Sequence, residues 1–133
     1  MAKKTLLYNV DSTVGKFGGN KPDDVVLVRF FIRRISAAPD VNGPYSKIAS
    51  VPIFDPELGE AITWFQKQVA AAGNAVSIDG RVDPAPHGQG FYTIRHLNAA
   101  YRKRYPQFQH SIESDPTYPA MLNTPLATAH VSY

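Results

Sequence analysis

Four histidines are the strongest nitrogen ligands for a metal ion in this chain, namely His87, His96, His110 and His130. No two of them have the i, i+4 spacing that places two imidazoles on one face of a helix, and no loop has the oxygen spacing of an EF-hand. The absence of cysteine excludes thiolate zinc sites, iron–sulfur clusters and disulfides. We therefore predict neither a metal site nor a cofactor.

Catalytic groups also lack the spacing that chemistry requires. No serine lies in a G-x-S-x-G nucleophile elbow, and no histidine–carboxylate partner is identifiable. Asp79 and Asp83 bracket Arg81, but a turn at Asp79 and a capped or salt-bridged loop at Asp83 explain this pair without acid–base chemistry. The loop VGKFGG lacks the GK[ST] ending of a phosphate loop. We expect a protein that is not an enzyme and has no catalytic residues.

Two groups of side chains are suited to binding. The first is a basic set near residues 95–104, which could meet phosphates or carboxylates, although cations at a helix end also complement the helix dipole. Its members are Arg95, His96, Arg102, Lys103 and Arg104. The second offers the flat rings and amides that carbohydrate sites use, although core packing also accounts for its larger rings. Its members are Trp64, Tyr92, Asn98 and Tyr101.

Three amphipathic segments must position these groups. The first helix is predicted to stop before Pro39, and its start is indicated by Asn20 as a cap, by Pro22 and by two aspartates. Residues 25–35 also satisfy strand periodicity with β-branched side chains, so a strand is the alternative there. The second helix is clearer: Asp55 caps it, Pro56 opens it, and Gly73 ends it. The third helix is predicted from about residue 91 to residue 104.

The apolar faces of these helices predict one core. Its ten members recur at helical spacing on the three segments. They are Val25, Val28, Ile32, Leu58, Ile62, Phe65, Val69, Ile94, Leu97 and Tyr101.

Short β or turn elements and a proline-rich tail complete the predicted chain. We expect a short strand from Thr5 to Val10 and either a small hairpin or a tight loop around Asp79-Gly80. Prolines recur after position 106, which predicts an irregular tail with at most one short helix. The prediction is therefore a mainly α protein, with a three-helix core domain at residues 1–106 and a C-terminal extension at 107–133 that packs partly on it.

Length and charge set further limits. A chain of 133 residues has room for one domain, and its net charge of +3 is too small to favour nucleic acid as the partner. The run VVLVRFFIRRI contains three arginines, so no segment approaches the roughly 20 apolar residues that span a bilayer. The N-terminus lacks a secretory apolar region. We expect no membrane span, and a cytoplasmic location unless a non-Sec route exports the protein.

Four segments carry a resemblance to a known family: VGKFGGNKPDDVVLVRFFI, AITWFQKQ, IDGRVDP and YTIRHLNAAYR. Over residues 14 to 105 the chain is similar to the three-helix peptidoglycan-binding-domain-like modules of bacterial cell-wall hydrolases and related phage or secretion proteins. In that family an Asp-Gly turn precedes a helix opened by threonine, and an aromatic–glutamine pair closes an amphipathic helix. Asp79-Gly80, Thr93 and Phe65-Gln66 occupy comparable places here.

The resemblance implies a peptidoglycan-binding-like three-helix bundle and a non-catalytic module that recognises peptidoglycan or a muropeptide. The ligand is expected in a shallow groove between the IDGRVDP loop and the third helix, and the candidate ligand-binding residues are Asp79, Arg81, Tyr92, Arg95 and Asn98. The family's DGxFG turn is replaced here by VPIFDPELG. The alternative is therefore a protein-interaction or structural module that keeps the fold, has lost the sugar, and binds its partner through the C-terminal tail.

Overall fold

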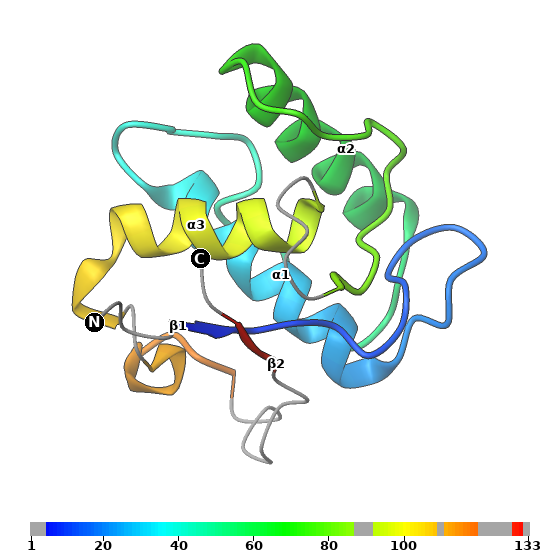
Figure 1. Ribbon diagram of the computed structural model, residues 1–133, viewed down its shortest axis with the longest axis horizontal. Coiled ribbons are helices and arrows are strands. Elements are labelled where there is room, and N and C mark those ends of the chain that lie inside the picture. Colours follow the sequence, from blue (N-terminus) through cyan, green and yellow to red (C-terminus); the bar gives the residue numbers. More distant parts are fainter. Residues whose placement is uncertain (1–4, 87–91, 109–110, 120–128, 132–133) are drawn as a thin grey trace.

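Three α-helices pack against one another in the part of the chain that the computed structural model describes, which is residues 5–86, 92–108, 111–119 and 129–131. They are α1 (Pro22–Ala37), α2 (Pro56–Ala71) and α3 (Thr93–Arg104). Figure 1 shows α3 crossing α1, with α2 beside them, and both helices contact α1. The prediction of a mainly helical protein with three helices is confirmed.

Residues 25–35, which satisfy both helical and strand periodicity, form the middle of α1. Every residue from Asp24 to Ile32 is buried, and all of them except Asp24 and Arg29 are apolar, so apolar side chains lie on every side of this part of the helix. A helix that is hydrophobic all round is typical of a buried core helix, and it loses the one-sided pattern that would distinguish it from a strand. This burial explains why periodicity alone did not distinguish a helix from a strand in this segment.

The predicted cap of α1 is wrong. Lys21 is the N-cap, and it makes no side-chain capping bond. Asn20 instead has a φ of 47° and uses its side chain to bond the backbone of Gly15 in the preceding loop, with Oδ1 accepting from N–H at 2.8 Å and Nδ2 donating to the carbonyl at 2.9 Å. Asp24 accepts the N–H groups of Asp11 and Ser12, each at 3.0 Å. The polar residues at the start of α1 therefore hold the loop that precedes the helix.

The ends of α2 follow the sequence prediction. Asp55 Oδ1 accepts the N–H of Leu58 at 2.9 Å, which satisfies one of the donors that a helix start leaves free. Gly73 has a φ of 88°, the left-handed conformation that commonly follows a helix.

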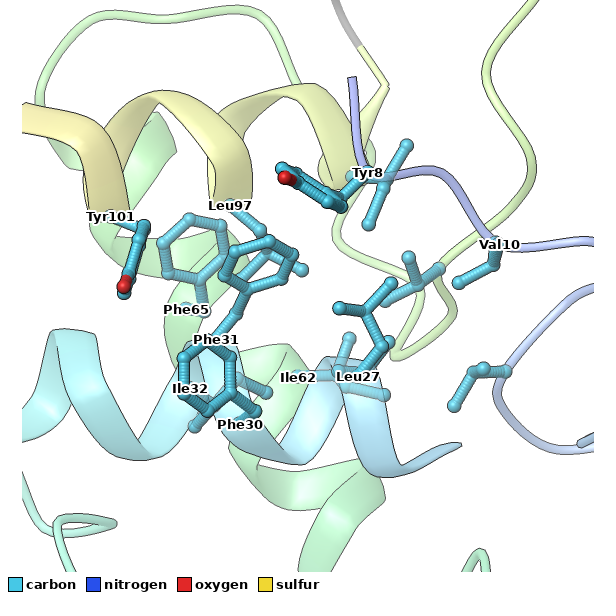
Figure 2. Packing of buried hydrophobic residues seen from close by; sticks show 14 of the residues in the cluster. Tyr8, Val10, Leu27, Phe30, Phe31, Ile32, Ile62, Phe65, Leu97 and Tyr101 are labelled. Carbon is cyan, nitrogen blue, oxygen red and sulfur yellow. The ribbon is translucent and has the colours of Figure 1, made fainter. Parts of the chain in front are cut away.

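All ten residues of the predicted core are buried. Figure 2 shows aromatic rings from α1 and α3 meeting between the helices, where the ring of Tyr101 lies 5.5 Å from that of Phe30 and 5.5 Å from that of Phe31. The core also includes residues outside the helices that the sequence did not select. They are Leu7, Tyr8, Val10, Val14, Ile48, Val82, Ala85 and Ile112.

The chain ends contribute a short antiparallel ladder. Strand β1 (Thr5–Leu7) pairs with β2 (Ala129–Val131), and Leu6 lies opposite His130. The predicted strand therefore begins at Thr5 but ends at Leu7, three residues earlier than expected. The backbone then pairs with a side chain: Asn98 in α3 accepts the N–H of Tyr8 at 2.9 Å and donates to its carbonyl at 3.1 Å.

The part of the C-terminal extension that directly follows α3 packs against α1 and α3. Two 3-10 turns, η1 (Pro106–Phe108) and η2 (Ile112–Ser114), follow α3. Ile112 is only 1% exposed. The Asp115 carboxylate accepts from Tyr101 Oη at 2.7 Å and pairs with Arg34 at 2.9 Å. Residues 111–119 are therefore tied to both α1 and α3.

Candidate functional site

One buried glutamine organises the region that the sequence selected as a binding site. Gln66 in α2 is fully buried, and its Nε2 donates to Asp79 Oδ1 at 3.0 Å, to the Arg81 carbonyl at 2.9 Å and to Thr93 Oγ1 at 3.0 Å. Its Oε1 accepts the N–H groups of Asp79 at 3.1 Å and Gly80 at 2.9 Å. One side chain thereby links α2, the Asp79-Gly80 turn and the first residue of α3.

The turn is also held from its other side. Val82 exchanges two backbone hydrogen bonds with Val14, of 2.8 and 2.9 Å. A Cβ added at Gly15 would lie 3.0 Å from the Gly80 carbonyl oxygen, so the loop before α1 packs directly on the turn. Val82 does not pair with Ile78, which is 49% exposed, and the hairpin alternative is therefore wrong. The turn joins two distant segments instead.

A cavity with a volume of about 870 Å³ lies against α2, beside this turn. That volume is within the range of about 300 to 1,000 Å³ typical of small-ligand sites. The Tyr45 and Trp64 rings, 5.6 Å apart, form an aromatic wall to which Phe54 adds. The remaining lining residues are Lys16, Asp55, Pro56, Gly59, Glu60, Thr63, Lys67, Asp79 and Gly80.

Two of the acidic side chains in the cavity are held by the protein. Asp55 accepts the N–H of Leu58, which lowers its pKa even though partial burial acts in the opposite direction, and Arg29 at 3.2 Å lowers it further. Arg29 is itself 1% exposed and donates to the carbonyls of Ala49 and Ile53. The Asp79 carboxylate accepts a hydrogen bond from Gln66 Nε2 and another from the N–H of Arg81 in its own turn.

The other charged side chains at the cavity point to a polar ligand. Lys16, Glu60 and Lys67 are exposed, and none of them is in a described ion pair. The lining thus combines flat aromatic surfaces with two lysines and three carboxylates, which are those of Asp55, Glu60 and Asp79. Such a lining suits a ligand with apolar ring faces and with hydroxyl or amide groups.

The five predicted site residues separate into two groups. Asp79, Arg81 and Tyr92 line one small pocket of about 150 Å³, together with Ser77, Asp83 and Thr93. That pocket lies between the IDGRVDP loop and α3, and it is smaller than a typical ligand site. The larger cavity lies on the α2 side of the same turn, and of the five predicted residues only Asp79 reaches it.

Arg95 and Asn98 lie below the surface. Asn98 is 1% exposed, and its amide bonds the backbone of Tyr8 and the carbonyl of Ile94. Arg95 is 4% exposed and donates to the carbonyl of Pro86 at 3.1 Å. In this arrangement both side chains hold neighbouring segments of the fold.

The basic set is divided as well. His96, Lys103 and Arg104 line a pocket of about 480 Å³ between α2 and α3, and Arg104 pairs there with Asp40 at 3.1 Å. Arg102 instead lies over the ring of Tyr8, 5.8 Å from its centroid. The set therefore does not form one continuous surface for phosphates.

Sequence reasoning selected Trp64 but missed its aromatic neighbours. Tyr45 and Phe54 lie in the connection before α2, where no periodicity indicates which way a side chain points. Lys16 comes from a loop almost fifty residues before Trp64. The one available signal was the Phe65-Gln66 pair, since a glutamine on the core face of a helix must find buried partners.

In the described residues, no group of three or more histidine or carboxylate side chains could hold a metal ion. No described helix is long and apolar enough to cross a membrane. No protein-family model, no curated protein and no solved structure matches the chain.

Proposed function

We propose that this protein is a non-catalytic binding module for bacterial cell-wall peptidoglycan, and that the glycan lies in the cavity along α2. The observation that carries the proposal is the 870 Å³ cavity walled by Tyr45 and Trp64, placed directly against the Asp79-Gly80 turn. Aromatic faces stack against the apolar faces of sugar rings, and the hydroxyl of Thr63 and the charged rim supply polar partners.

The cations at the rim suit the same ligand. Peptidoglycan carries free carboxylates on its peptides, and Lys16 and Lys67 are exposed at the cavity. Glu60 offers an acceptor for hydroxyl and amide groups. The proposal therefore gives Lys16, Lys67 and Glu60 each a polar partner on the ligand.

The hydrogen bonds of Gln66 connect the residues on which the resemblance to peptidoglycan-binding-like modules rests, and this supports the proposal. Phe65-Gln66, Asp79-Gly80 and Thr93 carried the likeness to peptidoglycan-binding-like modules, and Gln66 bonds to Asp79, Gly80 and Thr93 in space. These residues thus have a common physical task, which is to fix the turn that borders the cavity. Their co-occurrence in the sequence is expected if that arrangement is shared with the family.

The alternative is a protein-interaction module that has lost the sugar. Its expected partner surface was the C-terminal tail, yet in the described part of that tail Ile112 and Asp115 are buried against α1 and α3. Residues 111–119 then act as part of the fold, which leaves less of the tail for a partner. We rank this function second.

Co-sedimentation with purified sacculi tests the proposal. The wild-type protein is compared with a cavity variant, Tyr45→Ala/Lys67→Ala, and with a groove variant, Arg81→Ala/Tyr92→Ala. We expect the wild type and the groove variant to sediment with the sacculi, and the cavity variant to stay in solution although it still unfolds cooperatively on heating.

Three outcomes contradict the proposal in different ways. Absence of the wild-type protein from the pellet eliminates peptidoglycan as the ligand. If the groove variant fails to sediment with the sacculi while the cavity variant still does, peptidoglycan is the ligand but binds in the small pocket beside α3. Release of soluble muropeptides by the wild type would show that the protein is an enzyme.

A further inference from the structure

Phe17 is the most exposed large apolar side chain in the described residues. It is 89% exposed, whereas the other exposed large hydrophobic residues, Val51, Ile53 and Ile78, range from 38% to 64%. Burial of such a ring would contribute about 1.5 to 3 kcal/mol to folding, which Phe17 does not supply. Its position therefore needs a reason other than the stability of the core.

The loop that carries Phe17 is held at both ends. Val14 pairs with Val82 through two backbone hydrogen bonds, and Thr13 Oγ1 donates to Asp83 at 2.6 Å. On the other side the Asn20 side chain bonds the backbone of Gly15, and its N–H donates to the Thr13 carbonyl at 3.0 Å. Phe17 thus extends from a closed, internally bonded loop.

The backbone at Phe17 is strained. Its φ is 65°, in the left-handed region that a bulky side chain rarely adopts. Such a conformation persists only where the surroundings enforce it, and it often marks a functional position. Glycine or asparagine would fit this φ better, so stability alone does not account for phenylalanine here.

The same loop borders the cavity. Lys16 lines it, and the Lys16 ammonium lies 5.3 Å from the centre of the Phe17 ring. Gly15 packs on the Asp79-Gly80-Arg81 turn, so the loop has little room to shift along it. Phe17 is therefore an aromatic ring fixed just beyond the Lys16 side of the cavity.

We infer that Phe17 is a second stacking contact, which binds a sugar of the same glycan strand where the strand leaves the cavity. This inference rests on the proposed function and extends the binding surface from the cavity to a longer stretch of the glycan strand. A cavity of this volume holds a small ligand, whereas a wall glycan is a chain that must continue past the rim. The first aromatic face it meets beside Lys16 is that of Phe17.

Binding of two soluble fragments separates this contact from the cavity. The probes are a muropeptide with a single disaccharide and a glycan strand of several disaccharides, titrated by calorimetry. We expect the wild type to bind the longer fragment about three- to tenfold more tightly per site, as one aromatic stacking contact would give. Phe17→Asn removes that gain, keeps the affinity for the single disaccharide, and melts at the same or a higher temperature.

Phe17→Tyr is the matched control, since it keeps the flat ring and the same backbone strain. It should retain the preference for the longer fragment, while Phe17→Leu, apolar but not flat, should lose it. The inference is overturned if Phe17→Asn keeps the length preference, or if it loses both fragments equally. Failure of the wild type to bind either fragment would overturn the proposed function and this contact together.

Discussion

Gln66 Nε2 in α2 donates to Thr93 Oγ1, at the first residue of α3, across 3.0 Å. The two residues are 27 positions apart in the chain, and the same amide also holds the Asp79-Gly80 turn between them. The junction of two helices and a turn therefore depends on one buried polar side chain.

Gln66→Leu should destabilise the fold by on the order of 3 kcal/mol, because it leaves several donors and acceptors at this junction without partners. Urea unfolding measures the change. Gln68→Leu is the matched control: Gln68 lies on the same helix but is exposed, so a change within about 0.5 kcal/mol is expected. Equal costs for the two variants would contradict the assigned role of Gln66.

Asp115→Asn should weaken the fold at neutral pH by about 3 kcal/mol, because it deprives the partly buried Arg34 of its charged partner. The control is Asp40→Asn, whose side chain is 58% exposed in its pair with Arg104 and should cost less than about 1 kcal/mol.

The effect of Asp115→Asn should also depend on pH. Burial raises the pKa of Asp115, but hydrogen bonds from Thr117 and Tyr101, together with Arg34, bring it below its ordinary value. Because the pKa is lower in the folded state, the carboxylate stabilises the fold above about pH 4, and this contribution is lost as the pH falls through the folded value. The difference between wild type and variant should therefore shrink on acidification. A constant difference from pH 7 to pH 2 would contradict the direction of this shift.

Phe65→Ala should be among the most damaging single changes, at roughly 3 to 5 kcal/mol, because Phe65 is 3% exposed within the core. Phe17→Ala removes the same group from an exposed position and should leave the free energy of unfolding unchanged or slightly higher. Thermal melts of the two variants compare the loss of stability when a buried ring is removed with that when an exposed ring is removed. An unchanged melting temperature for Phe65→Ala would refute the core assignment.

Gly15→Ala should cost on the order of 3 kcal/mol, since a Cβ there would lie 2.8 Å from Arg81 Cγ and 3.0 Å from its Cα, at a φ of 147°. Gly73→Ala meets nothing within 4 Å at a φ of 88° and should cost about 1 kcal/mol from backbone strain alone. The difference in unfolding free energy measures how tightly the loop packs on the turn. If Gly15→Ala also weakens sacculus binding, the loop position matters to the cavity.

The α2 helix was predictable to its ends because its signals are local. Asp55 reaches an N–H three residues away, and Gly73 adopts its φ without help from distant residues. The start of α1 misled the same reasoning, since Asn20 and Asp24 resemble helix-start residues but use their side chains on residues 11–18. A polar side chain bonds whichever backbone group the fold brings near it, and sequence alone does not show that choice.

The structure brings together only part of the predicted site, whose role in binding stays a prediction. Asp79, Arg81 and Tyr92 do line one pocket, whereas Arg95 and Asn98 are turned into the fold. Tyr45 and Lys16 reach the larger cavity from loops far from α2 in sequence. No local pattern marks such residues, because their meeting depends on how the helices pack.

The sequence by itself determined three helices, the ends of the second, and the apolar side chains that bury between them, because each depends on the spacing of neighbours along the chain. Only the tertiary structure decided which polar groups meet. Gln66 donates to Asp79 in the turn, Asp115 pairs with Arg34, and Gly15 packs on Arg81. Each contact joins separate segments of the chain that are brought together by the packing of the helices. The contacts of Gln66 and Gly15 hold the turn that borders the cavity.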